Sequence, residues 1–99
     1  MDSLDLHTLE ESVVDEDTFL TFLAALASDR EDEVAKEQSN SSSPYSAGAN
    51  GWENGSIEGF LEAASAWAET SKHGMNNYEP PKNPWKRIAQ ILHMGKHYE

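Results

Sequence analysis

Two histidines near the end of the chain have a spacing that could bind a metal ion. His93 and His97 lie four residues apart, so a helix would place both imidazoles on one face, within reach of one ion. The residue after His93 is Met94 rather than the glutamate of a zinc-protease motif, and a third ligand would have to come from His73 or Glu99. The alternative is two surface histidines near a helix C-terminus, where positive charge is favourable. We therefore expect no bound cofactor, and metal binding by His93 and His97 stays open as an alternative function.

The other polar residues do not form a catalytic pattern. Glu58, Glu62 and Glu69 fall near one face of a predicted helix, which is more typical of an exposed stripe than of an acid–base pair. Five serines cluster in residues 38–51, away from any histidine, and the chain has no cysteine. No glycine-rich phosphate loop follows a predicted strand. We expect that the protein is not an enzyme.

Acidic residues outnumber basic residues in this chain of 99 residues. The chain has 18 Asp and Glu against 7 Lys and Arg, a net charge of −11 at pH 7. A field of this sign excludes unaided binding to nucleic-acid phosphates and argues against docking on anionic lipid. The acids are concentrated in residues 1–37, whereas residues 80–99 are net basic. So acidic a chain is suited to attracting a basic protein, but charge runs are also typical of solvated faces that serve solubility.

One acidic segment is the candidate contact region for a basic partner, together with the acids at positions 15–17. We expect its side chains to be dispensable for folding, because dense like charges repel one another, so neutralising Glu31, Asp32 and Glu33 should keep or raise stability. The segment consists of Asp29, Glu31, Asp32, Glu33 and Glu37.

Aromatic residues offer a second kind of contact. Trp67 and Trp85 occupy apolar stripes and are most simply core residues. Trp52 stands just before a predicted helix start, where it could fold over the helix as a lid or act as an exposed binding anchor. Trp52 and Tyr98 are therefore candidate aromatic anchors.

The elements that must position these residues are helical. Apolar spacing predicts a short helix within 4–13, a helix from about 16 to 29 that could run on to 37, one from Ser56 to about 71, and a last one from Pro84. Residues 38–51 are rich in Ser and Gly, and we expect a flexible loop there.

Together these elements predict an all-α fold. We expect one small domain, a bundle of three main helices plus a short N-terminal helix, since no run of residues alternates with the period of a strand. The expected core is built from Phe19, Phe22, Leu23, Leu26, Phe60, Leu61, Trp67, Trp85, Ile88 and Leu92.

Trp52-Glu53-Asn54 leads into the third predicted helix and Trp67 follows within it. The last helix begins at Asn83-Pro84-Trp85, and the chain ends in Tyr98-Glu99. In these features the chain resembles a family of small uncharacterised acidic bacterial proteins. Its members share a Trp-Glu-Asn sequence leading into a helix, a second tryptophan further along, and a final helix ending in Tyr-Glu. The family has no established activity, and the resemblance implies an immunity-type role only through the frequent pairing of such proteins with bacterial toxins. Gly59 departs from the acid expected at that position.

The function that fits best is an acidic cytosolic binding protein that masks a basic partner, for example a toxin in an immunity-type role. A structural or regulatory interaction module without catalytic activity is the alternative, and metal binding by His93 and His97 is the second. The acidic N-terminus lacks the positive charge of a signal peptide, and the longest apolar stretch, residues 19–27, is too short to cross a membrane. We therefore expect a cytoplasmic protein with no membrane or direct nucleic-acid contact. The oligomeric state is left open.

Overall fold

The computed structural model describes residues 5–41 and 48–98, and these residues form an all-α structure. The helices are α1 (Leu6–Glu11), α2 (Glu16–Ser39), α3 (Ile57–Lys72) and α4 (Pro84–His97). Within the described residues there is no strand, only an isolated antiparallel bridge between Met75 and Tyr78. The predicted all-α class is confirmed.

Side-chain caps fix where the helices begin. Asp15 accepts the backbone N–H of Thr18 at 2.9 Å, and the Thr18 hydroxyl accepts the N–H of Asp15 at 3.0 Å, which forms a capping box at the start of α2. Ser56 caps α3, and Asn83 caps α4 with Pro84 in the first turn. These starts agree with the sequence prediction because each rests on a local capping signal.

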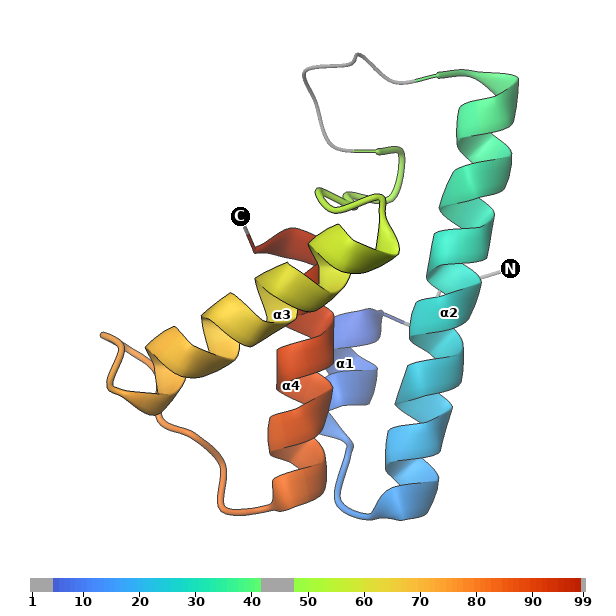
Figure 1. Ribbon diagram of the computed structural model, residues 1–99. Coiled ribbons are helices and arrows are strands. Elements are labelled where there is room, and N and C mark those ends of the chain that lie inside the picture. Colours follow the sequence, from blue (N-terminus) through green and yellow to red (C-terminus); the bar gives the residue numbers. More distant parts are fainter. Residues whose placement is uncertain (1–4, 42–47, 99) are drawn as a thin grey trace.

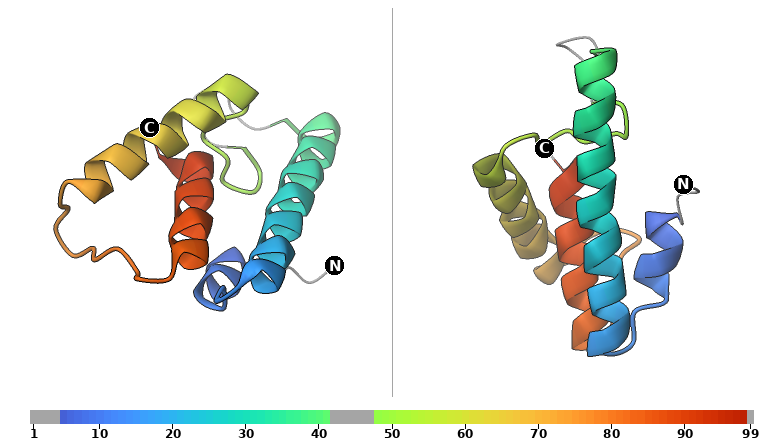
Figure 2. Two further views of the ribbon diagram at one scale, coloured as in Figure 1. Left: turned by 60° about the horizontal axis from the view of Figure 1, so that its bottom comes forward. Right: turned by 90° about the vertical axis from the view of Figure 1, so that its right-hand side faces the viewer.

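Helix α4 is the central element. Helix α3 packs across one side of α4, while α1 and the first half of α2 pack on the other side (Figures 1 and 2). The largest buried cluster lies where α1, α2 and α4 meet, and the partly buried Phe60, Trp85 and Leu92 pack against it. Its buried members are Val13, Phe19, Phe22, Leu26, Trp52 and Ala89.

The crossing of α3 and α4 depends on a glycine. A Cβ atom built on Gly95 would lie 2.8 Å from a ring carbon of Phe60 and 3.0 Å from the carbonyl oxygen of the same residue. The two backbones approach so closely that a larger residue at this position must push α3 away.

The prediction of a core position is wrong for three residues. Leu23, Leu61 and Ile88 are 39%, 56% and 42% exposed, whereas Phe19, Phe22, Leu26 and Trp67 are buried as predicted. For Leu23 and Leu61, the reason is that α2 and α3, among the helices that the structure describes, do not pack directly against each other. Apolar stripes on both helices therefore remain partly uncovered.

The segment 38–51, predicted as a flexible loop, contains residues that are helical or held by hydrogen bonds. Helix α2 continues through Ser39, so Gln38 and Ser39 are helical. Residues 48–51 are held by hydrogen bonds, among them the one from the N–H of Gly51 to the carbonyl of Gly48 at 2.9 Å. The middle of that segment, 42–47, lies outside the described residues.

Candidate functional site

A buried carboxylate organises the segment that leads into α3. Glu33 is 2% exposed, and its Oε1 accepts the backbone N–H groups of Asn50 at 2.9 Å and Trp52 at 3.1 Å. Its Oε2 lies 2.7 Å from Nη1 of Arg30. A buried carboxylate with this many donors is fully satisfied, so Glu33 holds the segment against α2.

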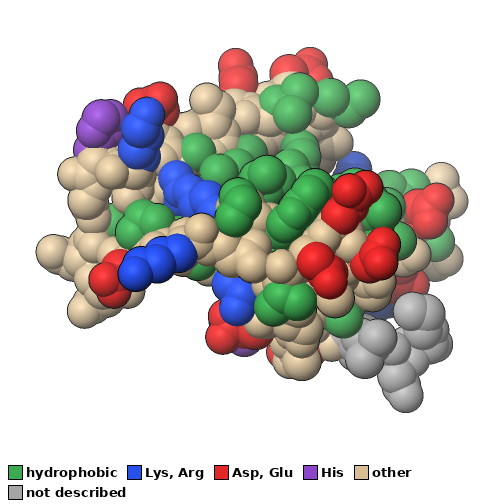
Figure 3. Space-filling view, turned by 90° about the horizontal axis from the view of Figure 1, so that it is seen from below, with side chains coloured by type: hydrophobic (Ala, Val, Ile, Leu, Met, Phe, Trp, Pro, Cys, Tyr) green, Lys and Arg blue, Asp and Glu red, His purple; other side chains and the backbone are tan. Residues whose placement is uncertain are grey.

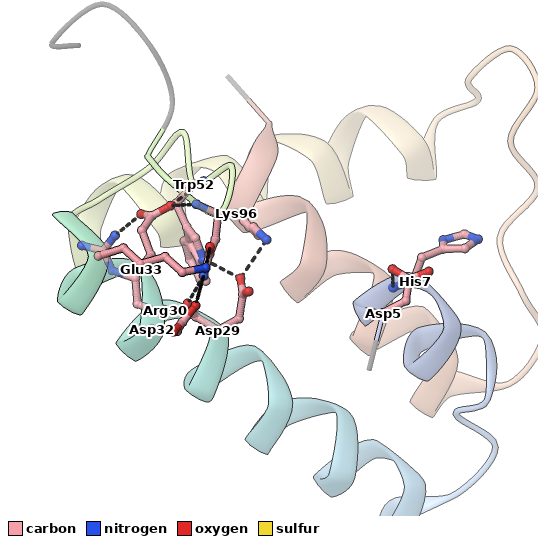
Figure 4. A network of polar contacts seen from close by, with 10 residues as sticks. Asp5, His7, Asp29, Arg30, Asp32, Glu33, Trp52 and Lys96 are labelled. Carbon is pink, nitrogen blue, oxygen red and sulfur yellow. Dashed lines mark hydrogen bonds and ion pairs between the residues drawn. The ribbon is translucent and has the colours of Figure 1, made fainter. Parts of the chain in front are cut away.

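Asp29 extends this network to α4. Its Oδ2 accepts hydrogen bonds from Nε1 of Trp52 and Nζ of Lys96, both at 2.8 Å. The charged ends of Arg30 and Lys96 lie 5.6 and 5.7 Å from the centre of the Trp52 ring. Figure 4 shows these side chains converging from α2, α4 and the segment before α3. The network fixes the positions of three separate parts of the chain.

Asn54 makes a second connection to α4. Its Nδ2 donates to the carbonyl oxygens of Gly95 and Tyr98, each at 2.9 Å. These carbonyls lie at the C-terminus of α4, where backbone acceptors lack helical partners. Trp52 and Asn54 therefore give the Trp-Glu-Asn sequence a structural role: both residues anchor the start of α3.

An apolar pocket opens beside this anchor, between α2 and the beginning of α3. Its volume is about 300 Å³. Nearly all of its lining is apolar, and the polar rim includes Arg30, whose Nη2 donates to the carbonyl oxygen of Gly55 at 3.1 Å. The apolar wall is formed by Leu23, Leu26, Ala27, Trp52, Ile57 and Phe60.

Uncovered apolar side chains continue beyond the pocket. Ile57 is 78% exposed, and Leu20 on α2 and Leu61 on α3 are also exposed. Seen from below, hydrophobic side chains gather across the middle of the molecule, and Asp and Glu side chains lie at several places around them, including the upper edge and the right-hand side of the view (Figure 3). An exposed apolar surface with charged residues around it is typical of a protein-binding site.

The histidines lie in a different place, under α1. His93 Nδ1 is 2.8 Å from Oε1 of Glu10, and the His93 and His97 rings are 5.3 Å apart. Burial, followed by the neighbouring positive charges of His93 and Lys96, holds the pKa of His97 below its ordinary value. His93 and His97 line a pocket of about 380 Å³ together with Asp5 and His7.

No metal site is assembled in the part of the chain that the structure describes. No group of three or more His, Cys, Asp or Glu there is arranged to hold an ion. His73 pairs with Glu69 at 3.5 Å near the C-terminus of α3, and Glu99 lies outside the described residues. Metal binding by His93 and His97 thus remains a prediction without a third ligand.

The predicted acidic face divides into two groups. The expectation that Asp29 and Glu33 are dispensable for folding does not fit the structure, because both belong to the network that holds Trp52. Neutralising Glu33 should therefore lower stability rather than keep or raise it. Glu31 and Asp32 are exposed, and Asp32 lies 2.8 Å from Lys36. Glu37 is half-buried and accepts the N–H of Ala49 at 2.9 Å. Their role in binding stays a prediction.

The structure gives different environments to the acids at 15–17 and to the two predicted aromatic anchors. Among the acids at 15–17, Asp15 is the cap of α2 and Glu16 and Asp17 occupy its first turn. Trp52 is 8% exposed, so it is a lid over the start of α3 and part of the pocket wall rather than an exposed anchor. Tyr98 is half-buried at the end of α4. The pocket was not predicted. Its signal in the sequence was the apolar spacing of residues such as Leu23, Leu26 and Phe60, which was interpreted as the spacing of core residues.

Comparison with known proteins places the chain in a family without a known activity. Among the described helices, none has both the length and the apolar character to cross a membrane. The chain matches no curated protein and no solved structure. Residues 15–99 match the model of a family described as a family of unknown function, DUF7660, and the match begins at the cap of α2. The resemblance to an uncharacterised family is thereby confirmed: the chain belongs to the family of unknown function DUF7660.

Proposed function

We propose that this protein is an acidic, non-catalytic binding protein of the cytoplasm whose partner is a basic protein. The observation that carries the proposal is the apolar pocket between α2 and α3, which lies on a chain of net charge −11. Burial of apolar surface supplies most of the affinity in a protein complex, and a field of one sign selects partners of the other sign. The two features occur together here.

The buried carboxylates support a binding role over a catalytic one. Glu10, Asp29 and Glu33 each contact a basic side chain: His93, Lys96 and Arg30, respectively. The pairs of Glu10 and Asp29 join different helices, and the pair of Glu33 lies within α2. A general acid or base must instead reach a reacting group. This use of the carboxylates favours a rigid scaffold that presents a surface.

An immunity-type role, in which the partner is a basic toxin, is one form of this proposal. The support for it is the charge of the chain together with the pocket. Masking a basic enzyme would need the same two features, an acidic rim and an apolar centre.

The proposal is tested by affinity capture from the native host at low and high salt. The test variant is Glu31→Gln combined with Glu58→Gln and Glu62→Gln, which neutralises exposed acids on α2 and α3. The matched control neutralises the exposed Glu11 and Glu79, in α1 and in the α3–α4 connection.

A basic protein should be captured by the wild type and by the control, and lost at high salt or with the test variant, because screening and neutralisation remove the same attraction. Capture of the same proteins by both variants at every salt concentration would contradict the proposal.

A further inference from the structure

We propose that the pocket between α2 and α3 is one end of a groove that binds a basic amphipathic helix of the partner. This inference rests on the proposed function and identifies the partner's contact element. It depends on three observations: the arrangement of the two walls, the apolar stripes along them, and the acids beside those stripes.

The walls have a V shape. Helices α2 and α3 come together where Arg30 Nη2 contacts the carbonyl oxygen of Gly55 at 3.1 Å, and they diverge from there (Figures 1 and 2). Helix α4 packs against both α2 and α3, but none of its residues lines the pocket, so a further helix could contact α2 and α3 on the pocket side. Packed helices lie about 8–10 Å apart, which makes a helix the element that suits a space between two helical walls.

Each wall carries an exposed apolar stripe at helical spacing. On α2, Leu20, Leu23 and Ala27 follow one another at intervals of three and four residues. On α3, Ile57 and Leu61 lie four residues apart and are the most exposed apolar residues of that wall. Leu23, Ala27 and Ile57 line the pocket, and side chains with this spacing lie on one face of a helix, so each stripe leads out of the pocket along its wall.

Acids accompany both stripes. Glu31 follows Ala27 by four residues on α2, at the end of the groove where the two walls meet. Glu58 and Glu62 each follow a member of the α3 stripe and are exposed on the adjoining face. Arg30 does not offset these charges, because its guanidinium already pairs with Glu33 at 2.7 Å. An occupant with an apolar face and flanking Lys or Arg complements the groove in both respects.

The same charges make a second copy of the chain a poor occupant. Two copies would bring together surfaces that belong to chains of net charge −11. The negative electrostatic fields of the two copies repel each other and oppose such an association. A basic partner is attracted by the same field. The groove therefore fits the helix-in-groove mode of recognition with a basic ligand.

A synthetic peptide serves as the probe: a fluorescein-labelled Lys/Leu helix of about four turns with all leucines on one face. Binding to the full-length protein is measured by fluorescence anisotropy. One comparison peptide replaces lysine with glutamate, and a second has the Lys/Leu composition in an order that gives no apolar face.

The test variants are Leu23→Gln on one wall and the pair Ile57→Gln and Leu61→Gln on the other. All three side chains are exposed, so thermal melts should show that the variants still fold. The matched control is Val34→Gln, an exposed apolar residue of α2 beyond the point where the walls meet.

The Lys/Leu helix should bind the wild type and Val34→Gln alike, and should bind the wall variants at least about tenfold more weakly, because central apolar contacts dominate binding energy. The glutamate peptide should not bind, and the reordered peptide should bind more weakly than the helix.

Equal binding by the wall variants, or by the reordered peptide, would overturn the inference while leaving a basic partner found by affinity capture in place. A protein dimer that the Ile57→Gln and Leu61→Gln pair dissociates would also overturn it, in favour of a second copy as occupant. If affinity capture fails but the peptide binds in the groove as described, the proposed function fails and the groove assignment stands.

Discussion

The indole Nε1 of Trp52 donates a hydrogen bond of 2.8 Å to Oδ2 of Asp29, which lies 23 residues earlier in the chain. The same oxygen accepts Nζ of Lys96 at 2.8 Å, so one carboxylate joins α2, the start of α3 and the end of α4. These contacts lie beside the apolar pocket and set the distance between its two walls. The stability of the fold and the shape of the groove therefore depend on the same few polar residues.

Replacement of Glu33 by glutamine should destabilise the protein by about 3 kcal/mol. The amide cannot accept all the hydrogen bonds of the carboxylate and leaves Arg30 without its charge partner. Chemical unfolding in urea measures the change. The exposed Glu31→Gln is the matched control and should stay within about 0.5 kcal/mol of the wild type. Equal stability of the two variants would show that Glu33 is not an anchor.

Replacement of Gly95 by alanine should destabilise the protein by about 1–2 kcal/mol, although alanine favours a helix by about 1 kcal/mol. The new methyl group would meet the ring and the carbonyl oxygen of Phe60. Thermal or urea unfolding measures the change.

A second substitution isolates the steric contact. Phe60→Leu replaces the ring that meets the new methyl group with a smaller side chain. Gly95→Ala should therefore lower the free energy of unfolding less in that background, which a double-mutant cycle measures. Stabilisation by Gly95→Ala alone would mean that the two helices separate without loss, contrary to a tight crossing.

Stability should fall as the pH drops below about 6.5, in part because of His97. Burial, followed by the charges of His93 and Lys96, lowers the pKa of His97 in the folded protein from its ordinary value of 6.5. The unfolded chain then takes up the proton more readily, so this contribution is present above the unfolded pKa and lost as the pH falls through the lowered folded pKa.

The measurement is the urea midpoint at about pH 7.5 and about pH 5, for the wild type and for His97→Gln. The wild type should lose more stability between the two pH values than the variant does. An equal loss would assign the whole pH dependence to other groups.

Local signals predicted the fold well. The capping residues Asp15, Ser56 and Asn83 predicted where three helices begin, because a cap acts on backbone groups within a few residues of itself. The end of α2 was harder to predict, since contacts between the helix and residues 48–52 extend it, and these contacts join residues far apart in sequence.

Tertiary arrangement explains the residues whose environment was predicted wrongly. Leu23 and Leu61 have the spacing of core residues, but spacing cannot tell which of two helices will lack a neighbour. Glu33 looked like one more acid in a charged run, and nothing in its local sequence shows that the N–H groups of Asn50 and Trp52 converge on it. The exposed Leu23 and Leu61 belong to the walls of the proposed groove, and Glu33 belongs to the network that anchors the segment beside it.

Backbone amide NMR during titration with the Lys/Leu helix tests the central claim most directly. The claim is that the space between α2 and α3 binds a basic amphipathic helix. Chemical shift changes should concentrate at residues 20–31 of α2 and at residues 57–61 of α3, and the glutamate peptide should cause none. Changes confined to surfaces away from both walls, or no changes while the protein remains folded, would contradict the claim.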